Sequence, residues 1–173
     1  MAATAQISLE EYLRTPWEPD AEYVRGEVQE RHMGEYEHNI VQREILLWFH
    51  SHDKVWQTRT IQEQRTRLNA QNVRVPDVSV WHRVVPVQPV FDQPQLIAVE
   101  VLSPEDRQSR MQEKIEDYRS FQVPNIWVID PVKRIGWDCS DGNWTRKERF
   151  EVAGSPIYLD LQELFKELDA AEA

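Results

Sequence analysis

Apolar residues recur along the chain with two different periods, and the pattern predicts a mixture of helices and strands. Helical features mark four segments: a helix opened by Ser8 with Glu11 three residues later, then 35–51, 107–122, and the end of 157–168 behind Asp160. Strand features mark the others: 21–33 (a hairpin turning at Arg25-Gly26), 55–67, 72–81, 96–102, 125–131, 135–145 (a second hairpin) and the start of 157–168.

Two of the strand segments are apolar almost throughout, as is typical of strands covered on both faces. They read LIAVEVL at 96–102 and NIWVIDP at 125–131. The helix predicted between them leaves room for a crossover connection, so we expect the two strands to be parallel neighbours. The pattern therefore predicts an α/β protein with a mixed central β-sheet flanked by helices, in one domain over residues 1–173.

One acidic residue stands inside the first of these apolar strands. Glu100 has apolar neighbours on both sides, and a carboxylate is almost never fully buried without a partner. A second acidic residue, Asp77, follows Pro76 and leads into the strand predicted at 72–81. Taken alone, a Pro-Asp pair is more often a turn or the start of a strand than a functional site. Asp130 before Pro131 is interpreted as turn chemistry.

Lys114 interrupts the apolar stripe of the helix predicted after Glu100. The stripe consists of residues spaced by four and three positions: Met111, Ile115, Tyr118 and Phe121. A lysine in such a stripe can extend its ammonium outward to solvent, which is the unremarkable explanation. It can also place the ammonium beside Glu100, and burial then costs less for both groups.

Two carboxylates and a lysine suit one kind of chemistry. Carboxylate oxygens are the hard ligands that Mg²⁺ prefers, and Mg²⁺ keeps water molecules and accepts phosphate oxygens as further ligands. A bound ion of this kind activates water and stabilises charge on a phosphodiester, while a lysine neutralises developing negative charge. The sequence thus predicts Asp77 and Glu100 as metal ligands, close together at the sheet edge, with Lys114 beside them.

The amino-acid composition bears on whether this site could act on nucleic acid. The chain carries 20 Lys and Arg against 30 Asp and Glu, a net charge of −10, whereas nucleic-acid-binding proteins usually have an excess of basic residues. DNA binding is therefore expected to be weak or aided by metal.

The seven tryptophans are expected mainly in the core. A single cysteine, no apolar span and no secretory signal indicate a cytoplasmic protein that does not enter a membrane.

The motifs VPDVSV around Asp77, AVEVLSP around Glu100, QEKIEDYR around Lys114 and the following VPNIWVIDP resemble the Uma-type restriction endonuclease family. This is a bacterial family of unknown function within the PD-(D/E)XK nuclease superfamily. The resemblance extends from the YVRGEV hairpin to the final LDLQELF and implies a restriction endonuclease-like core.

The resemblance also implies roles for individual residues. The superfamily takes its lysine two positions after the second acidic residue, but Leu102 stands there, so the lysine is expected from the next helix, as Lys114. Glu27 is suggested as an additional acidic member of the catalytic set, and His38 as a polar neighbour. Taken alone, Glu27 is more often a solvated hairpin residue and His38 more often a histidine on a helix surface. Relatives often carry an acidic residue where this chain has Arg110.

Three functions remain open at this point. The first is a Mg²⁺-dependent DNA endonuclease, expected as a homodimer because cutting both strands needs two sites or two encounters. The second is a catalytically inactive nuclease-fold module for binding or assembly, which the acidic charge and Arg110 favour. The third is a metal-dependent hydrolase of a small phosphorylated substrate, for which no phosphate-binding loop is visible. Fold alone does not decide among them.

Overall fold

A six-stranded mixed sheet forms the centre of the computed structural model, which describes residues 6–31, 34–104, 106 and 108–172. Its strands lie in the order β10-β9-β8-β7-β6-β3, with bounds Thr145–Lys147, Ile135–Asp138, Asn125–Asp130, Ile97–Val101, Val78–His82 and Thr58–Gln62. β7 and β8 pair in parallel, with Ile97 opposite Asn125, and the other neighbours in this sheet are antiparallel. The predicted parallel pair is confirmed, as is the mixed sheet.

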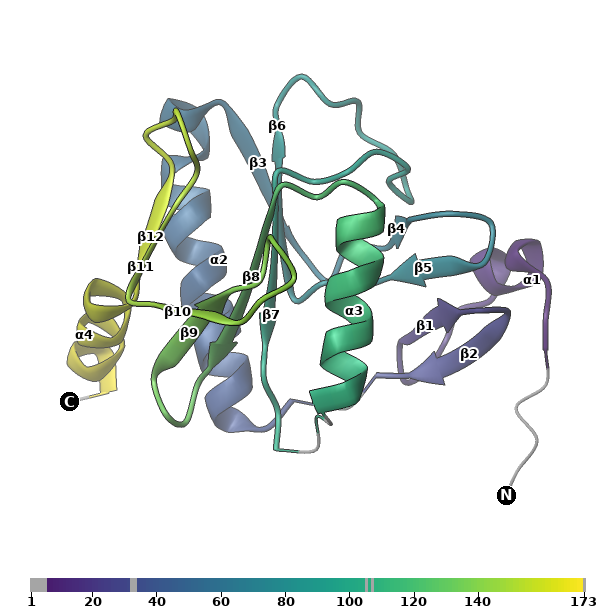
Figure 1. Cartoon of the computed structure of the whole chain (residues 1–173), viewed down its shortest axis with the longest axis horizontal. Coiled ribbons are helices and arrows are strands. Elements are labelled where there is room, and N and C mark those ends of the chain that lie inside the picture. The colour runs from purple at the N-terminus through teal and green to yellow at the C-terminus, as the bar shows by residue number, and fades with distance from the viewer. Residues whose placement is uncertain (1–5, 32–33, 105, 107, 173) are drawn as a thin grey trace.

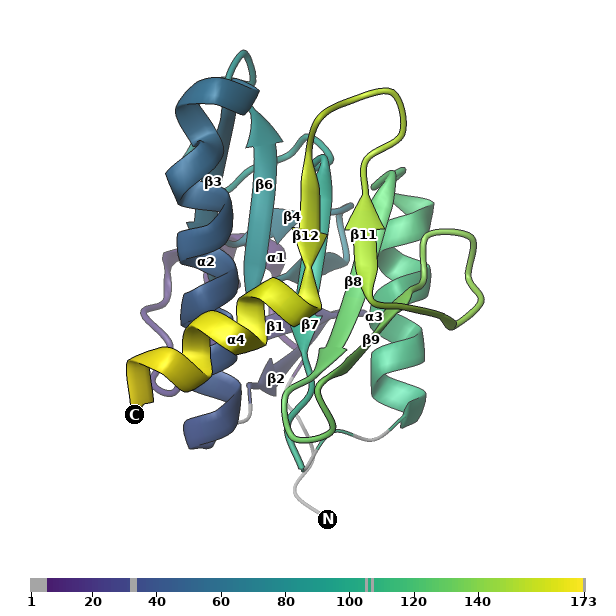
Figure 2. The same cartoon turned by 90° about the vertical axis from the view of Figure 1, so that its left-hand side faces the viewer.

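Helices cover both faces of this sheet (Figures 1 and 2). On one face lie α2 (Tyr36–Trp56), α4 (Leu161–Glu172) and the small antiparallel pair β11 (Arg149–Glu151) and β12 (Tyr158–Asp160). On the other face lies α3 (Gln108–Ser120). Successive residues of a strand point to opposite faces, so Ile97, Val99 and Val101 pack toward α2, while Ala98 packs toward α3. Glu100 therefore points to the α3 side.

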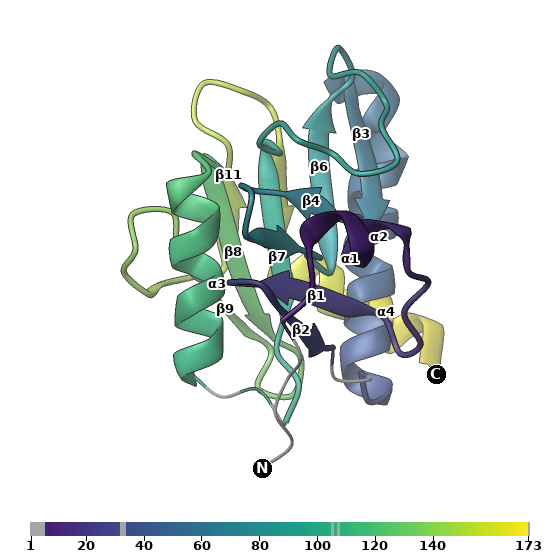
Figure 3. The same cartoon turned by 90° about the vertical axis from the view of Figure 1, so that its right-hand side faces the viewer.

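A second, four-stranded sheet lies beside the first and carries the N-terminal part of the chain (Figure 3). Its order is β2-β1-β5-β4, with bounds Glu27–Glu30, Ala21–Val24, Asn72–Arg74 and Thr66–Arg67. The short helix α1 (Leu9–Arg14) begins as predicted, because the Ser8 side chain accepts the Glu11 N–H at 3.1 Å. Tyr12 and Tyr23 join Val73 in a small core beneath this sheet.

The first hairpin turns where the sequence predicted. Arg25 and Gly26 both have positive φ values, 53° and 86°, which fit the tight two-residue turn that matches strand twist. The second hairpin joins β9 to β10, and the Asp160 side chain accepts the N–H groups of Gln162 and Glu163, capping α4 as predicted.

The predicted bounds were wrong for one helix and for two of the strands. α2 continues to Trp56, so the strand expected over 55–67 begins at Thr58, after Gln57 in a left-handed conformation. That segment also forms two strands in two sheets, β3 and β4, because the chain turns after Gln62 at Glu63, which has a positive φ. The helix is longer because Trp56 stacks on His52 one turn earlier, at 4.2 Å between ring centroids. The strand expected over 72–81 is two strands in two sheets, because Pro76 has no N–H to donate to a neighbouring strand.

Three of the seven tryptophans are buried core residues, and the other four are partly buried and pack against the core clusters. Trp81 and Trp127 are fully buried and Trp48 is nearly so. Trp127 stacks on Phe49 of α2 and lies against Phe150 of β11, so it joins the central sheet to its covering layer. Among the described helices, none is long and apolar enough to cross a membrane.

Candidate active site

Glu100 is buried beneath α3 and makes two contacts with that helix. It is 1% exposed. Its Oε2 lies 3.0 Å from Lys114 Nζ, and its Oε1 accepts a hydrogen bond of 2.5 Å from the Tyr118 hydroxyl. Lys114 and Tyr118 are four residues apart, so they occupy one face of the helix and reach the same carboxylate. The structure thus brings together Lys114, which interrupts the apolar stripe of α3, and Glu100, which interrupts the apolar strand β7.

Asp77 lies immediately before β6, beside the end of β7. Val78 is opposite Val99, and one residue further in the same register Asp77 is opposite Glu100. The Asp77 carboxylate is held from two sides: Oδ2 accepts the Val101 N–H at 2.8 Å and lies 3.3 Å from His38 Nε2, while Oδ1 accepts from Arg31 at 2.9 Å. Opposed residues on paired strands have side chains about 5 Å apart at their roots, so Asp77 and Glu100 share one site.

A third buried carboxylate, Glu22 of β1, was missed by the sequence analysis. It is 4% exposed. It accepts the Val75 N–H at 3.0 Å and a hydrogen bond of 2.9 Å from Arg74, and it lies 3.5 Å from Lys114 Nζ. Its neighbours Ala21, Tyr23 and Val24 are all buried. The signal was therefore present, because Glu22 interrupts an apolar strand just as Glu100 does.

Glu27 does not belong to the residues that line this site. It pairs with Val24 at the turn end of the hairpin, whereas Gln29, two residues further on, is opposite Glu22 and does line the site. Two residues along a strand correspond to roughly 6.5 Å, which is enough to take the Glu27 side chain past the cavity. The carboxylate that the hairpin brings to the site is that of Glu22.

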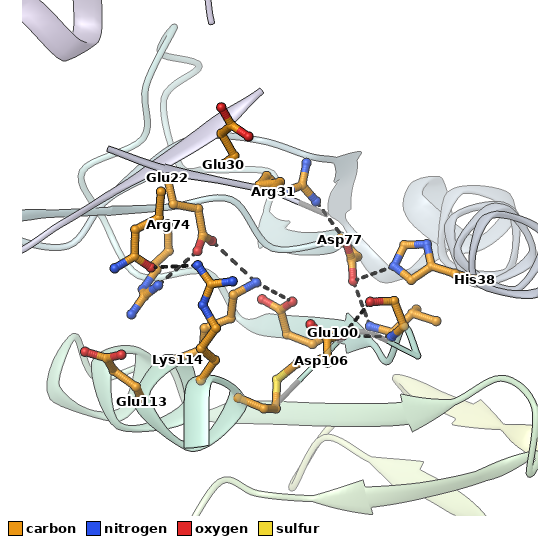
Figure 4. A pocket seen from close by; sticks show the side chains of 15 residues that line it. Glu22, Glu30, Arg31, His38, Arg74, Asp77, Glu100, Asp106, Glu113 and Lys114 are labelled. Atoms are coloured by element: carbon orange, nitrogen blue, oxygen red, sulfur yellow. Dashed lines mark hydrogen bonds and ion pairs between the residues drawn. The ribbon is translucent and has the colours of Figure 1, made fainter. Parts of the chain in front are cut away.

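Figure 4 shows the cavity that these residues surround. Its acidic lining residues are Glu22, Glu30, Asp77, Glu100, Asp106 and Glu113, and its basic ones include Arg31, Arg74, Arg110 and Lys114. Arg110 donates to Gln29 Oε1 at 3.3 Å, so it crosses from α3 to the hairpin at the mouth of the site. His38, from α2, is 8% exposed and also lines the cavity. Asp130 accepts the N–H groups of Val132 and Lys133, which confirms its role in a turn.

The charges in the cavity act on one another strongly. Burial raises the pKa of Glu100 to about 7, and the Asp77 and Glu22 carboxylates add to the rise, against the opposing effect of Lys114. Burial would also raise the pKa of Asp77, but its hydrogen bond with His38 and the charges of His38, Lys114 and Arg31 lower it. At neutral pH, Asp77 is therefore ionised and Glu100 lies near its titration midpoint.

Lys114 remains a cation at neutral pH. Burial by itself lowers the pKa of its ammonium, but the charges of Glu100 and Glu22 outweigh that effect and raise it above the ordinary value. Lys114 consequently cannot take up a proton from water, and its contribution to chemistry in this environment is positive charge and hydrogen-bond donation.

The donor atoms of the site suit a magnesium ion held by two carboxylates. Asp77 and Glu100 could provide hard oxygen ligands from adjacent strands, because both carboxylates line the same cavity. Within the described parts of the chain, no three or more His, Cys, Asp or Glu side chains form a ready-made metal site. Mg²⁺ is commonly held by only one or two carboxylates, with water and substrate phosphate as its other ligands.

Arg74 ties the hairpin to α3 behind the cavity, and its removal is expected to destabilise the fold. Arg74 is 2% exposed and bonds Glu22 at 2.9 Å and Asp117 at 2.8 Å. Arg74→Met keeps the packing volume but leaves both carboxylates short of a cation, so unfolding by urea should become easier by about 3 kcal/mol. Arg119→Met, at an exposed position of α3, is the control and should change the free energy of unfolding little. Equal unfolding free energies for the two variants would contradict this prediction.

Comparison with known proteins agrees with this architecture. The family model described as Uma2, putative restriction endonuclease, matches residues 9–164. A crystal structure of a putative nuclease belonging to DUF820 from Anabaena variabilis ATCC 29413 superposes with a TM-score of 0.80 at 23% sequence identity, covering 94% of this chain and 99% of that one. That likeness shows a shared fold. No curated protein matches this sequence. With more than half of its length matched by the family model, the chain belongs to the Uma2 family.

Proposed function

We propose that this protein is a Mg²⁺-dependent DNA endonuclease that hydrolyses phosphodiester bonds. Asp77 and Glu100 hold the metal ion, and Lys114 assists the reaction. The observation that carries the proposal is the contact between Lys114 and Glu100, 3.0 Å long and facing the same cavity as Asp77. The family description and the nuclease fold of the similar structure support nucleic acid as the substrate.

Each residue of the site has a separate task in this proposal. A bound Mg²⁺ would supply an activated water molecule and a positive charge on the phosphate oxygens. Asp77 is held in place by the Val101 N–H and by His38, so its carboxylate needs little reorganisation to act as a ligand. Lys114, as a permanent cation, stabilises the negative charge that develops on the phosphate during attack.

The acidic surface affects how DNA reaches the site. With a net charge of −10, the protein repels phosphate, so we expect DNA binding to be weak without divalent metal and stronger with it. A homodimer would bring two such sites to the two strands of a duplex.

A catalytically inactive binding module is the second candidate. It is favoured by Arg110, because the family resemblance implies an acidic residue at that position. Such a module would have no use for a buried Glu100 with a raised pKa, because an apolar residue there would stabilise the fold more. This cost to stability is what functional sites commonly bear, and it favours the endonuclease.

Cleavage of supercoiled plasmid DNA during a MgCl₂ titration tests the proposal. The wild-type protein is expected to nick or linearise the plasmid with Mg²⁺ and to stop on chelation with EDTA. Asp77→Asn should lower the rate roughly 100-fold or more, as expected for loss of a charge that holds the metal. Asp130→Asn is the matched control, because Asp130 is also a buried aspartate at a strand end, and it should cleave like the wild type. Metal-independent cleavage, or equal cleavage by both variants, would contradict the assignment.

A further inference from the structure

Arg31 stands between two cavities and bonds carboxylates in both. It follows β2 directly, its side chain is 15% exposed, and its backbone N–H donates to the Asp20 carbonyl at 3.1 Å. Toward the candidate active site, its Nη2 lies 2.9 Å from Asp77 Oδ1. Toward the outer side, its Nη1 lies 3.5 Å from Glu63 and 3.7 Å from Asp20. Figure 4 shows the contact with Asp77.

The outer cavity offers the guanidinium a second position. It has a volume of about 240 Å³ and is lined by Asp20, Arg31, His38 and Glu63, among others. Glu63 is anchored beside Asp77, because its N–H donates to the Asp77 carbonyl at 3.1 Å and Gln42 donates to its side chain at 3.3 Å. A short movement away from Asp77 therefore brings Arg31 closer to two carboxylates that already lie near it.

A divalent cation at Asp77 and the guanidinium of Arg31 compete for the same negative charge. Both are positive, so they repel each other when they occupy adjacent oxygens of one carboxylate. Without a divalent ion, Arg31 compensates Asp77, just as Lys114 compensates Glu100, and the buried acidic pair is tolerated.

We propose that Arg31 is a built-in competitor of the divalent ion at Asp77. It occupies Asp77 in the metal-free protein and transfers its ion pair to Glu63 and Asp20 when the ion binds. Arg31 is thus a positioning residue that sets the affinity of the site for metal. This inference rests on the proposed function in placing the ion on Asp77 and Glu100.

Calorimetric titration of the full-length protein with Mn²⁺ alone, without DNA, tests the inference independently of cleavage. Arg31→Gln is expected to bind Mn²⁺ roughly tenfold more tightly than the wild type, within the range of coupling between members of one ion-pair network. Arg65→Gln is the matched control, because Arg65 is also a partly buried arginine but forms its ion pair, 3.0 Å long, with Asp20 on the outer side of Arg31. It should tighten Mn²⁺ binding much less. Unchanged or weaker binding by Arg31→Gln would overturn the inference.

Glu63→Gln gives a second and opposite test. Removing the outer partner leaves Arg31 more firmly on Asp77, so Mn²⁺ affinity should fall several-fold. Glu30→Gln, which removes an equal charge from the lining of the inner cavity, is the control for general electrostatics and should have a smaller effect. In the Arg31→Gln background, Glu63→Gln should lose most of its effect; additive changes would overturn the inference. Because the Glu63 side chain is 46% exposed, this variant decides the question if Arg31→Gln does not fold.

Asp77→Asn separates this inference from the proposed function. If Asp77→Asn binds Mn²⁺ as tightly as the wild type, the ion is not held by Asp77 and both proposals fail. If Asp77→Asn loses binding but Arg31→Gln gains none, the metal site stands and only the role of Arg31 is refuted. Gain of binding in Arg31→Gln together with its loss in Asp77→Asn supports both.

Discussion

Lys114→Met is expected to remove most Mg²⁺-dependent DNA cleavage while the protein still folds. Lys114 is the cation that contacts both Glu100 and Glu22 in the cavity, and loss of one preorganised donor to a developing negative charge typically costs roughly 10²–10³-fold in rate. Methionine retains an unbranched apolar side chain of similar length, so it fills the space of the lysine stem. The fold survives because Glu100, with a pKa of about 7, can take up a proton in place of the lost ion pair.

The control for this prediction is the same substitution at another lysine that contacts a carboxylate. Lys133 lies 3.4 Å from Asp130 at the end of the neighbouring strand, but its side chain is 72% exposed. Lys133→Met should cleave plasmid DNA at the wild-type rate, and circular dichroism should show that both variants are folded. If Lys114→Met cleaved as fast as Lys133→Met, Lys114 would have no part in the reaction.

The central part of the site could be predicted because each residue broke a local pattern. Glu100 interrupts an apolar strand and Lys114 interrupts an apolar helical stripe, and a crossover connection places strand end and helix face together. Tyr118 was recognised only as part of the stripe. Its hydroxyl bonds Glu100, a contact that apolar periodicity does not reveal, because tyrosine serves both purposes.

The remaining part of the site depends on contacts between distant segments of the chain. Glu22 and Arg74 meet across two strands that are separated by 52 residues, and Arg31 meets Asp77 across 46. Periodicity within one element carries no information on such pairings. The break at Pro76 had a similar consequence, since it directs β5 and β6 into different sheets and places Asp77 at the junction between them.

Glu100→Gln is expected to abolish metal-dependent cleavage and, in addition, to change how stability depends on pH. The pKa of Glu100 is raised from 4.5 to about 7 in the folded protein. A carboxyl group with a raised pKa contributes its stability fully below pH 4.5 and loses it as the pH rises through 7. Glutamine cannot ionise, so it should escape a loss of about 3 kcal/mol, the free-energy equivalent of this shift.

Urea unfolding followed by tryptophan fluorescence at pH 5, 6, 7 and 8 measures this effect. The unfolding free energy of Glu100→Gln, relative to that of the wild type, should rise across this range.

Glu22→Gln is the matched control, because its pKa is shifted in the opposite direction. Burial alone would raise the pKa of Glu22, but the charges of Lys114 and Arg74 lower it. The stability that Glu22 contributes is present above its unfolded pKa and disappears as the pH falls. Glu22→Gln should therefore be destabilising by nearly the same amount at all four pH values, because the contribution of Glu22 is lost only below its unfolded pKa of 4.5. Parallel pH profiles for Glu100→Gln and the wild type would show that the pKa of Glu100 is not raised in the folded protein, and that its burial among Asp77, Glu22 and Lys114 leaves its ionisation unchanged.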